Sequence, residues 1–118
     1  MELLIENALN IGTDEFYRAL RYRLCLVVML INTEDKNAFN ILEKIIRKSD
    51  VLQQIDSDTI IVFLSHTTKN ESILFIDKIK DKFSFSYTVS EYNGSTYKGS
   101  EFKFLETLFL KNGDKHLY

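Results

Sequence analysis

Hydrophobic residues recur along the chain at two spacings, one typical of helices and one typical of strands. Spacings of three and four residues predict helices over residues 2–23 and 35–48. The same pattern follows Thr68 and Ser100, whose side chains suit the capping position at the start of a helix. The sequence therefore predicts four helical segments, the first of which is interrupted near residues 10–13.

Strands are predicted between these helical segments. Residues 24–31 are apolar throughout, as expected of a central strand that is buried on both faces. Residues 51–65 contain two strand-like stretches around a polar turn at residues 56–58, which predicts a hairpin. Residues 84–90 alternate hydroxyl with apolar side chains, and the Asn93-Gly94 pair after them is typical of the turn of a second hairpin.

The predicted order of elements is β-α-β-β-α-β, with one more helical segment at each end. Right-handed crossovers fold this order into an antiparallel sheet with two helices on one face, the ferredoxin-like arrangement of the α+β class. A chain of 118 residues that is 45% hydrophobic matches one domain, residues 1–118. Many unrelated functions use this architecture, so function has to be argued from motifs.

Charge and composition indicate the cellular compartment and exclude some classes of binding partner. Fifteen basic and 17 acidic residues predict no attraction to nucleic acid or to anionic lipid. The longest apolar run, residues 24–31, is too short to insert across a membrane. The single cysteine and an acidic start without a basic segment indicate a reducing compartment and no secretory signal. We therefore expect a cytoplasmic protein.

Five short stretches occur in a distinctive order over nearly the whole chain. They are residues 7–20, Arg47-Lys48-Ser49-Asp50, the turn at residues 56–60, Thr88-Val89-Ser90 and residues 107–115. Together they resemble the GGDEF domain family, the diguanylate cyclases. The resemblance implies a palm-like form of the predicted fold and a role in bacterial signalling through cyclic di-GMP. It also implies that Arg47 and Asp50 form an R-x-x-D inhibitory site.

The departures from the family pattern concern its catalytic residues. The signature G-G-D-E-F falls on Asp56, Ser57, Asp58, Thr59 and Ile60. Both glycines, which let backbone approach a nucleotide phosphate, are therefore replaced by residues with side chains. The resemblance places metal-binding carboxylates at Asn32 and Thr59, which have none, so that only Asp58 is left, with Glu34 as a displaced candidate. We expect no catalytic residues, no metal, no cofactor and no synthesis of cyclic di-GMP.

Arg47 and Asp50 are open to two interpretations. By the resemblance, Arg47 binds a guanine edge or a phosphate of cyclic di-GMP, and Asp50 accepts a hydrogen bond from a guanine N–H. Such sites usually need a second arginine, for which the candidates are Arg18, Arg21, Arg23 and Lys48. In the other interpretation Arg47 closes a helix, Asp50 caps the turn, and the two side chains pair on the surface.

The two terminal helical segments are more apolar than a solvent-exposed helix requires. The apolar residues are Leu3, Leu4, Ile5, Leu9 and Ile11 at one end, and Phe102, Phe104, Leu105, Leu108, Phe109 and Leu110 at the other. Either both segments pack on the open side or the edges of the sheet, or part of their surface binds a protein partner or a second copy. The alternative function is thus a protein–protein interaction or scaffold module without a small ligand, with Phe102, Leu105 and Phe109 as the contact residues.

Overall fold

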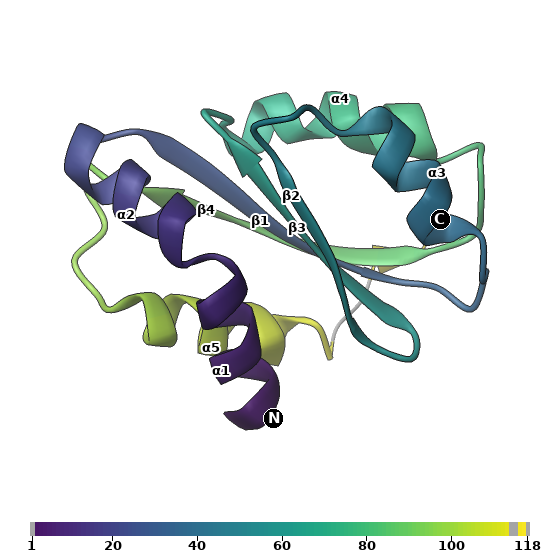
Figure 1. The fold of residues 1–118 in the computed structure, drawn as a ribbon, viewed down its shortest axis with the longest axis horizontal. Coiled ribbons are helices and arrows are strands. Elements are labelled where there is room, and N and C mark those ends of the chain that lie inside the picture. The colour runs from purple at the N-terminus through teal and green to yellow at the C-terminus, as the bar shows by residue number, and fades with distance from the viewer. Residues whose placement is uncertain (1, 114–115, 118) are drawn as a thin grey trace.

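The computed structural model describes residues 2–113 and 116–117 of the chain. Helices and strands follow the predicted order, with the first helical segment divided in two (Figure 1). The elements are α1 (Glu2–Ile11), α2 (Thr13–Tyr22), β1 (Cys25–Asn32), α3 (Ala38–Ile45), β2 (Val51–Asp56), β3 (Thr59–Ser65), α4 (Lys69–Ile79), β4 (Ser86–Asn93), α5 (Glu101–Lys111) and β5 (His116–Leu117).

The strands form one sheet in the order β2-β3-β1-β4-β5. The central strand β1 is antiparallel to both of its neighbours, β3 and β4. This is the strand order of the ferredoxin-like unit, with β5 added beyond β4. The predicted α+β class and the burial of the central strand on both faces are confirmed, because residues 26–31 of β1 are all 1% exposed or less.

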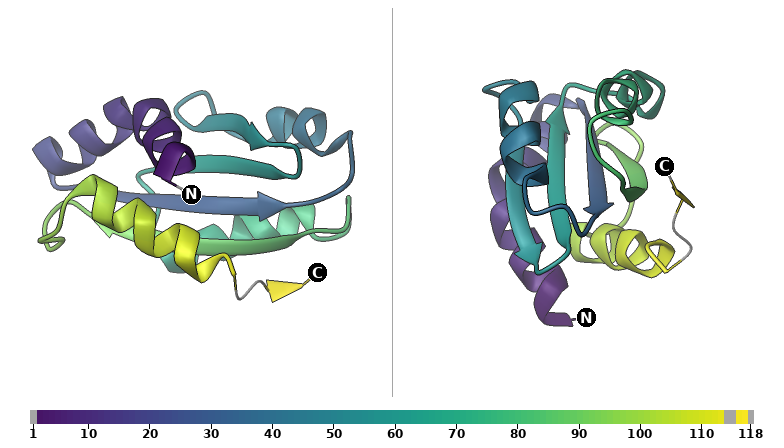
Figure 2. Two further views of the ribbon diagram at one scale, coloured as in Figure 1. Left: turned by 90° about the horizontal axis from the view of Figure 1, so that it is seen from below. Right: turned by 90° about the vertical axis from the view of Figure 1, so that its right-hand side faces the viewer.

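Helices cover both faces of the sheet, which makes three layers (Figure 2). Successive side chains of β1 point to opposite faces and divide the core into two clusters. Val27, Met29 and Ile31 pack with α3 and α4 on one face. On the other face Leu26, Val28 and Leu30 pack with apolar residues of the terminal helices: Ile5, Ala8, Phe16, Ala19, Phe104, Leu105, Leu108 and Phe109.

The terminal helices therefore bury most of their apolar residues against the open face of the sheet. Leu105 is fully buried and Phe109 is only 7% exposed, while Phe102 is partly buried against the same cluster. Leu105 and Phe109 are part of the core, so the prediction that these two residues contact a partner is wrong. Phe102 keeps part of its surface exposed, and its contact with a partner stays a prediction. Amphipathic periodicity marks an apolar helix face but does not tell whether the sheet or another molecule covers it.

An aromatic cluster holds α2 and α5 on this face. The ring of Phe16 packs edge-to-face against Phe63, Tyr92 and Phe104, at centroid distances of 5.9, 5.0 and 5.9 Å. Gly12, between α1 and α2, lies directly over Phe63, and a Cβ there would stand 2.3 Å from its ring. The interruption of the first helical segment thus occurs where backbone must approach the core closely.

The chain departs from prediction after β4. Asn93-Gly94 does not open a second hairpin, because the chain passes through a loop into α5. The backbone N–H of Gly94 donates to the carbonyl of Leu24, and that of Tyr97 donates to the carbonyl of Asn93. The ring of Tyr97 then packs against Tyr92 and Phe104, so aromatic contacts direct the loop toward α5. Among the described residues, no helix is long and apolar enough to cross a membrane.

Candidate functional site

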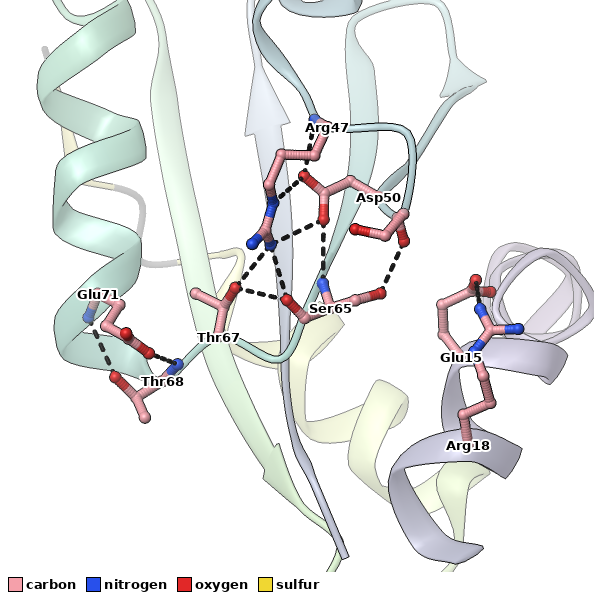
Figure 3. A network of polar contacts seen from close by, with 9 residues as sticks. Glu15, Arg18, Arg47, Asp50, Ser65, Thr67, Thr68 and Glu71 are labelled. Atoms are coloured by element: carbon pink, nitrogen blue, oxygen red, sulfur yellow. Dashed lines mark hydrogen bonds and ion pairs between the residues drawn. The ribbon is translucent and has the colours of Figure 1, made fainter. Parts of the chain in front are cut away.

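Arg47 and Asp50 form the turn between α3 and β2. The backbone N–H of Asp50 donates to the carbonyl of Arg47, at 3.0 Å. In return, the backbone N–H of Arg47 donates to Oδ2 of Asp50 at 3.0 Å. The two side chains face one another across the turn, with Nε 3.1 Å from Oδ2 and Nη2 3.0 Å from Oδ1 (Figure 3). The spacing R-x-x-D therefore closes a turn through a bidentate ion pair.

The carboxylate of Asp50 is buried, with a side chain that is 2% exposed. Besides its three hydrogen bonds from Arg47, it accepts the backbone N–H of Ser65, on β3, at 3.1 Å. An ionised carboxylate has acceptor sites for about four hydrogen bonds. All of the acceptor capacity of Asp50 is therefore used inside the fold. Asp50 caps the turn and pairs with Arg47, but it does so beneath the surface.

Arg47 lies above this carboxylate and is 55% exposed. Its Nη2 also lies 2.7 Å from the carbonyl of Ser65 and 2.9 Å from Oγ1 of Thr67, so its two hydrogens are shared among three acceptors. The hydrogen bond to Asp50 is the main reason that the pKa of Arg47 is raised. Within the described part of the chain, all hydrogen bonds of the guanidinium use Nε and Nη2. The Nη1 group is therefore the part of Arg47 that a ligand can use.

The loop between β3 and α4 is fixed by its own hydrogen bonds. Thr68 accepts the backbone N–H of Glu71 at 3.2 Å, and Glu71 accepts the backbone N–H of Thr68 at 2.9 Å. This reciprocal pair is the predicted capping box. Hydrogen bonds from the Thr68 backbone and side chain lower the pKa of Glu71. The loop thus presents Ser65 and Thr67 to Arg47 in a defined position.

Two cavities lie beside the Arg47 turn, and His66 lines both. One, of about 230 Å³, lies between α3 and α4 and includes Arg47 and Asp50 in its walls. The other, of about 260 Å³, lies toward α2 and is lined in part by Ser49, Ser65 and Arg18. Arg18 is half exposed and donates to the buried carboxylate of Glu15 at 2.6 Å (Figure 3). Of the four candidates for a second basic residue, only Arg18 lines either cavity.

The hairpin turn at residues 56–60 is held by its own polar groups. The backbone N–H of Ser57 donates to Oδ1 of Asp56, and the amide of Gln54 donates to the carbonyls of Asp56 and Thr59. The carbonyl of Asp58 accepts the backbone N–H of Thr33 at 2.9 Å. Ile60 is buried in the core beneath α3 and α4. The carboxylate of Asp58 lies 3.1 Å from the hydroxyl of Thr59, which has one hydrogen to share between Asp58 and the amide oxygen of Asn32.

A neutral polar cluster lies at the same end of the sheet. The amides of Asn32, at the end of β1, and Asn112, at the end of α5, donate to each other at 2.8 and 3.3 Å. The hydroxyl of Thr59 donates to Asn32 at 3.2 Å, and that of Thr88 donates to Asn112 at 2.9 Å. We call these four residues the amide clasp. It ties the end of α5 to the three central strands of the sheet.

No protein-family model and no curated protein matches this sequence. Solved structures do match the fold. The FimX GGDEF domain from Pseudomonas aeruginosa is similar to this chain with a TM-score of 0.70 and 8% identity, over 92% of this chain and 85% of that one. The chain has the fold of GGDEF domains. The resemblance inferred from short motifs is thus confirmed at the level of fold.

Two further structures support this GGDEF-like fold. A DGC protein from Thermotoga maritima has a TM-score of 0.58 at 17% identity, over 92% of this chain and 91% of that one. PelD 158-CT from Pseudomonas aeruginosa PAO1 has a TM-score of 0.58 at 15% identity, over 90% of this chain and 45% of that one. Identities this low show a shared architecture only. The function of this GGDEF-like domain therefore has to be argued from its own residues.

The amide clasp occupies the positions at which the family resemblance expects metal-binding carboxylates. Asn32 and Thr59, to which the resemblance assigned metal-binding carboxylates, are both members of the clasp. Within residues 2–113 and 116–117, no group of three or more His, Cys, Asp or Glu side chains is arranged to hold a metal ion. Sequence reasoning missed Asn112, which carries one half of the clasp. The only signal was its position before Gly113, which indicates a helix end and no partner.

Proposed function

We propose that this GGDEF-like domain is a catalytically inactive signalling domain that recognises cyclic di-GMP through Arg47. The amide clasp supports the first part of the proposal. A magnesium site that bridges a triphosphate needs several anionic oxygens. At Asn32 and Thr59 the domain offers neutral groups that already bond each other and Asn112. Binding of a metal ion there would break the hydrogen bonds of the clasp. The neutral side chains would not neutralise the charge of the ion.

Incubation of the purified protein with GTP and magnesium tests the loss of catalysis. We expect no cyclic di-GMP, measured by chromatography and mass spectrometry. Asp58 is the one signature carboxylate left at its family position, so Asp58→Ala is the informative variant. A product that forms with the natural sequence and disappears with Asp58→Ala would overturn the assignment.

The single observation that carries the recognition part is the way Asp50 holds Arg47. The bidentate pair fixes the guanidinium while 55% of Arg47 stays exposed. A pre-positioned guanidinium loses little freedom when it binds a phosphate or a guanine edge. Because the carboxylate of Asp50 is fully used, we assign it to positioning Arg47 rather than to accepting a guanine N–H. This assignment replaces the role that the resemblance gave to Asp50.

Arg18 is our choice for the second basic residue of the site. It lines the cavity on the α2 side of the turn, which Ser49 and Ser65 line as well. Glu15 holds one nitrogen of its guanidinium, Nη2, whereas Asp50 holds two nitrogens of Arg47. A ligand with two phosphates or two guanine rings can contact both arginines at once, which one arginine alone does not allow.

Calorimetric titration with cyclic di-GMP tests this site. Arg47→Lys is preferred to Arg47→Ala because it keeps a cation beside the buried carboxylate while it removes the bidentate fork. We expect a Kd of about 1 μM or tighter, which corresponds to about −8 kcal/mol, and loss of binding in Arg47→Lys. Arg21→Ala, on the exposed side of α2, is the matched control and should bind normally. No heat with the natural sequence would refute the ligand.

An interaction module is the second candidate, and one observation favours it. Three large side chains of α2 are uncovered, Tyr17, Leu20 and Tyr22, which are 50–60% exposed, and Tyr17 and Leu20 are neighbours on its outer face. Leu20→Asp changes only this outer face, so the fold should survive. We then expect the apparent mass of the natural sequence to rise with concentration and that of Leu20→Asp to stay monomeric. Ile73→Asp, at an equally exposed position of α4, is the control.

A further inference from the structure

A cavity of about 350 Å³ lies across the edge of β4, away from the Arg47 turn. Ser90 and Glu91 both line it, although consecutive strand residues point to opposite faces of a sheet. Ser90 faces α5, since its hydroxyl accepts Nζ of Lys111 at 3.4 Å. Glu91 faces α4, since its Oε1 accepts the backbone N–H of Lys69 at 2.6 Å. A space that touches both residues must pass over the backbone edge of the strand.

This edge is suited to accept another strand. On its inner side β4 pairs with β1 over eight consecutive residue pairs without irregularity, so its outer side is regular as well. On that outer side β5 already pairs antiparallel with Ser86 and Tyr87. Among the described strands, none pairs with the outer side of residues 90–93. The carbonyl of Asn93 accepts the backbone N–H groups of Thr96 and Tyr97, so the loop closes this end of the edge. The outward backbone groups of residues 90–92 therefore form the edge at which an extended segment can pair.

The opposite edge of the sheet is less regular. The pairing of β2 with β3 shifts register between Gln54 and Asp56. Such irregularities bend a strand and interrupt its ladder, which discourages addition of a further strand. The regular edge of β4 is thus the better one for recognition.

The side chains around the β4 edge define what it can bind. Lys69 stands on the α4 side and Lys111 on the α5 side. The carboxylate of Glu91 is already bonded, through Oε1 to the Lys69 backbone and through Oε2 to the thiol of Cys25. On the α5 side, the rings of Tyr97 and Phe104 pack edge-to-face at 5.6 Å and line the cavity. The edge therefore offers two cations, an aromatic wall and unpaired backbone.

From this arrangement we propose that the β4 edge binds an extended, acidic segment of a partner protein by strand addition. The backbone of the segment pairs with residues 90–92 and continues the line of β5 along the sheet. Alternate side chains of the segment point to opposite faces. An aromatic residue packs against Tyr97 and Phe104, and acidic residues lie near Lys69 and Lys111. This site shares no lining residue with the cavities beside Arg47.

Titration of the isotope-labelled full chain with a short peptide, followed by amide NMR, tests the proposal. The probe is acetyl-Glu-Phe-Glu-Glu-Glu-Thr-amide. Its first, third and fifth residues are Glu and face Lys69, while Phe and the remaining Glu share the other face with Tyr97, Phe104 and Lys111. We expect the largest shifts at the amides of residues 90–92. Two control peptides separate the contributions: one has Lys in place of Glu, and one has N-methylated backbone at alternate positions. The first removes the charge complementarity, and the second blocks strand pairing.

A charge reversal on the protein completes the test. Lys69 is the first residue of α4, where a carboxylate suits the helix dipole, so Lys69→Glu should fold normally. We expect it to weaken peptide binding about fivefold, whereas Lys44→Glu, the same charge change on α3, should leave it unchanged. Absence of shifts at residues 90–92, equal binding of the basic peptide, or equal binding of the N-methylated peptide would each overturn the proposal.

Discussion

Arg47 donates three hydrogen bonds to the carboxylate of Asp50, one from its backbone N–H and two from its guanidinium. The same carboxylate accepts the backbone N–H of Ser65, which belongs to the neighbouring part of the sheet. Asp50 therefore joins the turn after α3 to β3 and sets the position of Arg47. Recognition by Arg47 and stability of the turn depend on the same buried carboxylate.

Asp50→Ala should destabilise the domain more than Arg47→Ala. Removal of Asp50 leaves two backbone N–H groups and Nε of Arg47 without their acceptor, which costs about 2–4 kcal/mol. Removal of Arg47 leaves a buried carboxylate with two backbone donors, and because Arg47 is 55% exposed the cost is smaller, about 1–2 kcal/mol. Urea unfolding monitored by circular dichroism measures both variants. The opposite order of midpoints would contradict the assigned role of Asp50.

The amide clasp should hold the end of α5 on the sheet. Asn112→Ala removes the partner of two buried groups, the amide of Asn32 and the hydroxyl of Thr88. Each unsatisfied buried polar group costs about 1–3 kcal/mol, so the two groups together cost about 2–6 kcal/mol. Hydrogen exchange should speed up most at the end of α5. Asn40→Ala, at an exposed position of α3 with one 3.4 Å hydrogen bond, should change little. Equal effects of the two variants would argue against the clasp.

The capping box should make stability sensitive to acid. The folded-state pKa of Glu71 is lowered, so its contribution is present above its ordinary value of 4.5 and is lost as the pH falls through the lowered value. Between these two values the unfolded state binds more protons, so stability rises with pH. At about pH 7, Glu71→Gln should be less stable than Glu43→Gln. At about pH 3 the difference in stability between the two variants should be smaller. Urea midpoints of both variants at the two pH values measure this. A constant difference would contradict the prediction.

Local signals in the sequence were sufficient for most elements of the fold. The continuous apolar run of β1 predicted its burial on both faces, and Thr68 with Glu71 predicted the capping box, because these signals act within one element. The Asn93-Gly94 pair was misread because the contacts of Tyr97 with Tyr92 and Phe104 direct the chain after it. Turn preferences do not include such tertiary contacts.

The candidate site was predictable only in part, for the same reason. The spacing of Arg47 and Asp50 indicated a pair, but their contacts with Ser65 bridge separated segments and depend on the register of β3. Asn32 and Asn112 are 80 residues apart and share no periodicity. The cavity over β4 depends on how α4 and α5 approach the two faces of one strand. No pattern within a single segment specifies any of these three relationships.

Gly12→Ala should destabilise the domain by about 1–3 kcal/mol through overpacking. The new Cβ would stand 2.3 Å from the ring of Phe63, which is fully buried and packs against Phe16, so the ring has little room to move. The backbone of Gly12 has a negative φ of −94°, so strain of the backbone itself does not contribute. Gly113→Ala is the matched control, because among residues 2–113 and 116–117 a Cβ there meets only the carbonyl of Leu110, at 3.4 Å. Thermal and urea unfolding of both variants measure the change in stability. An unchanged stability of Gly12→Ala would contradict the prediction and show that α1 and α2 can shift away from the sheet.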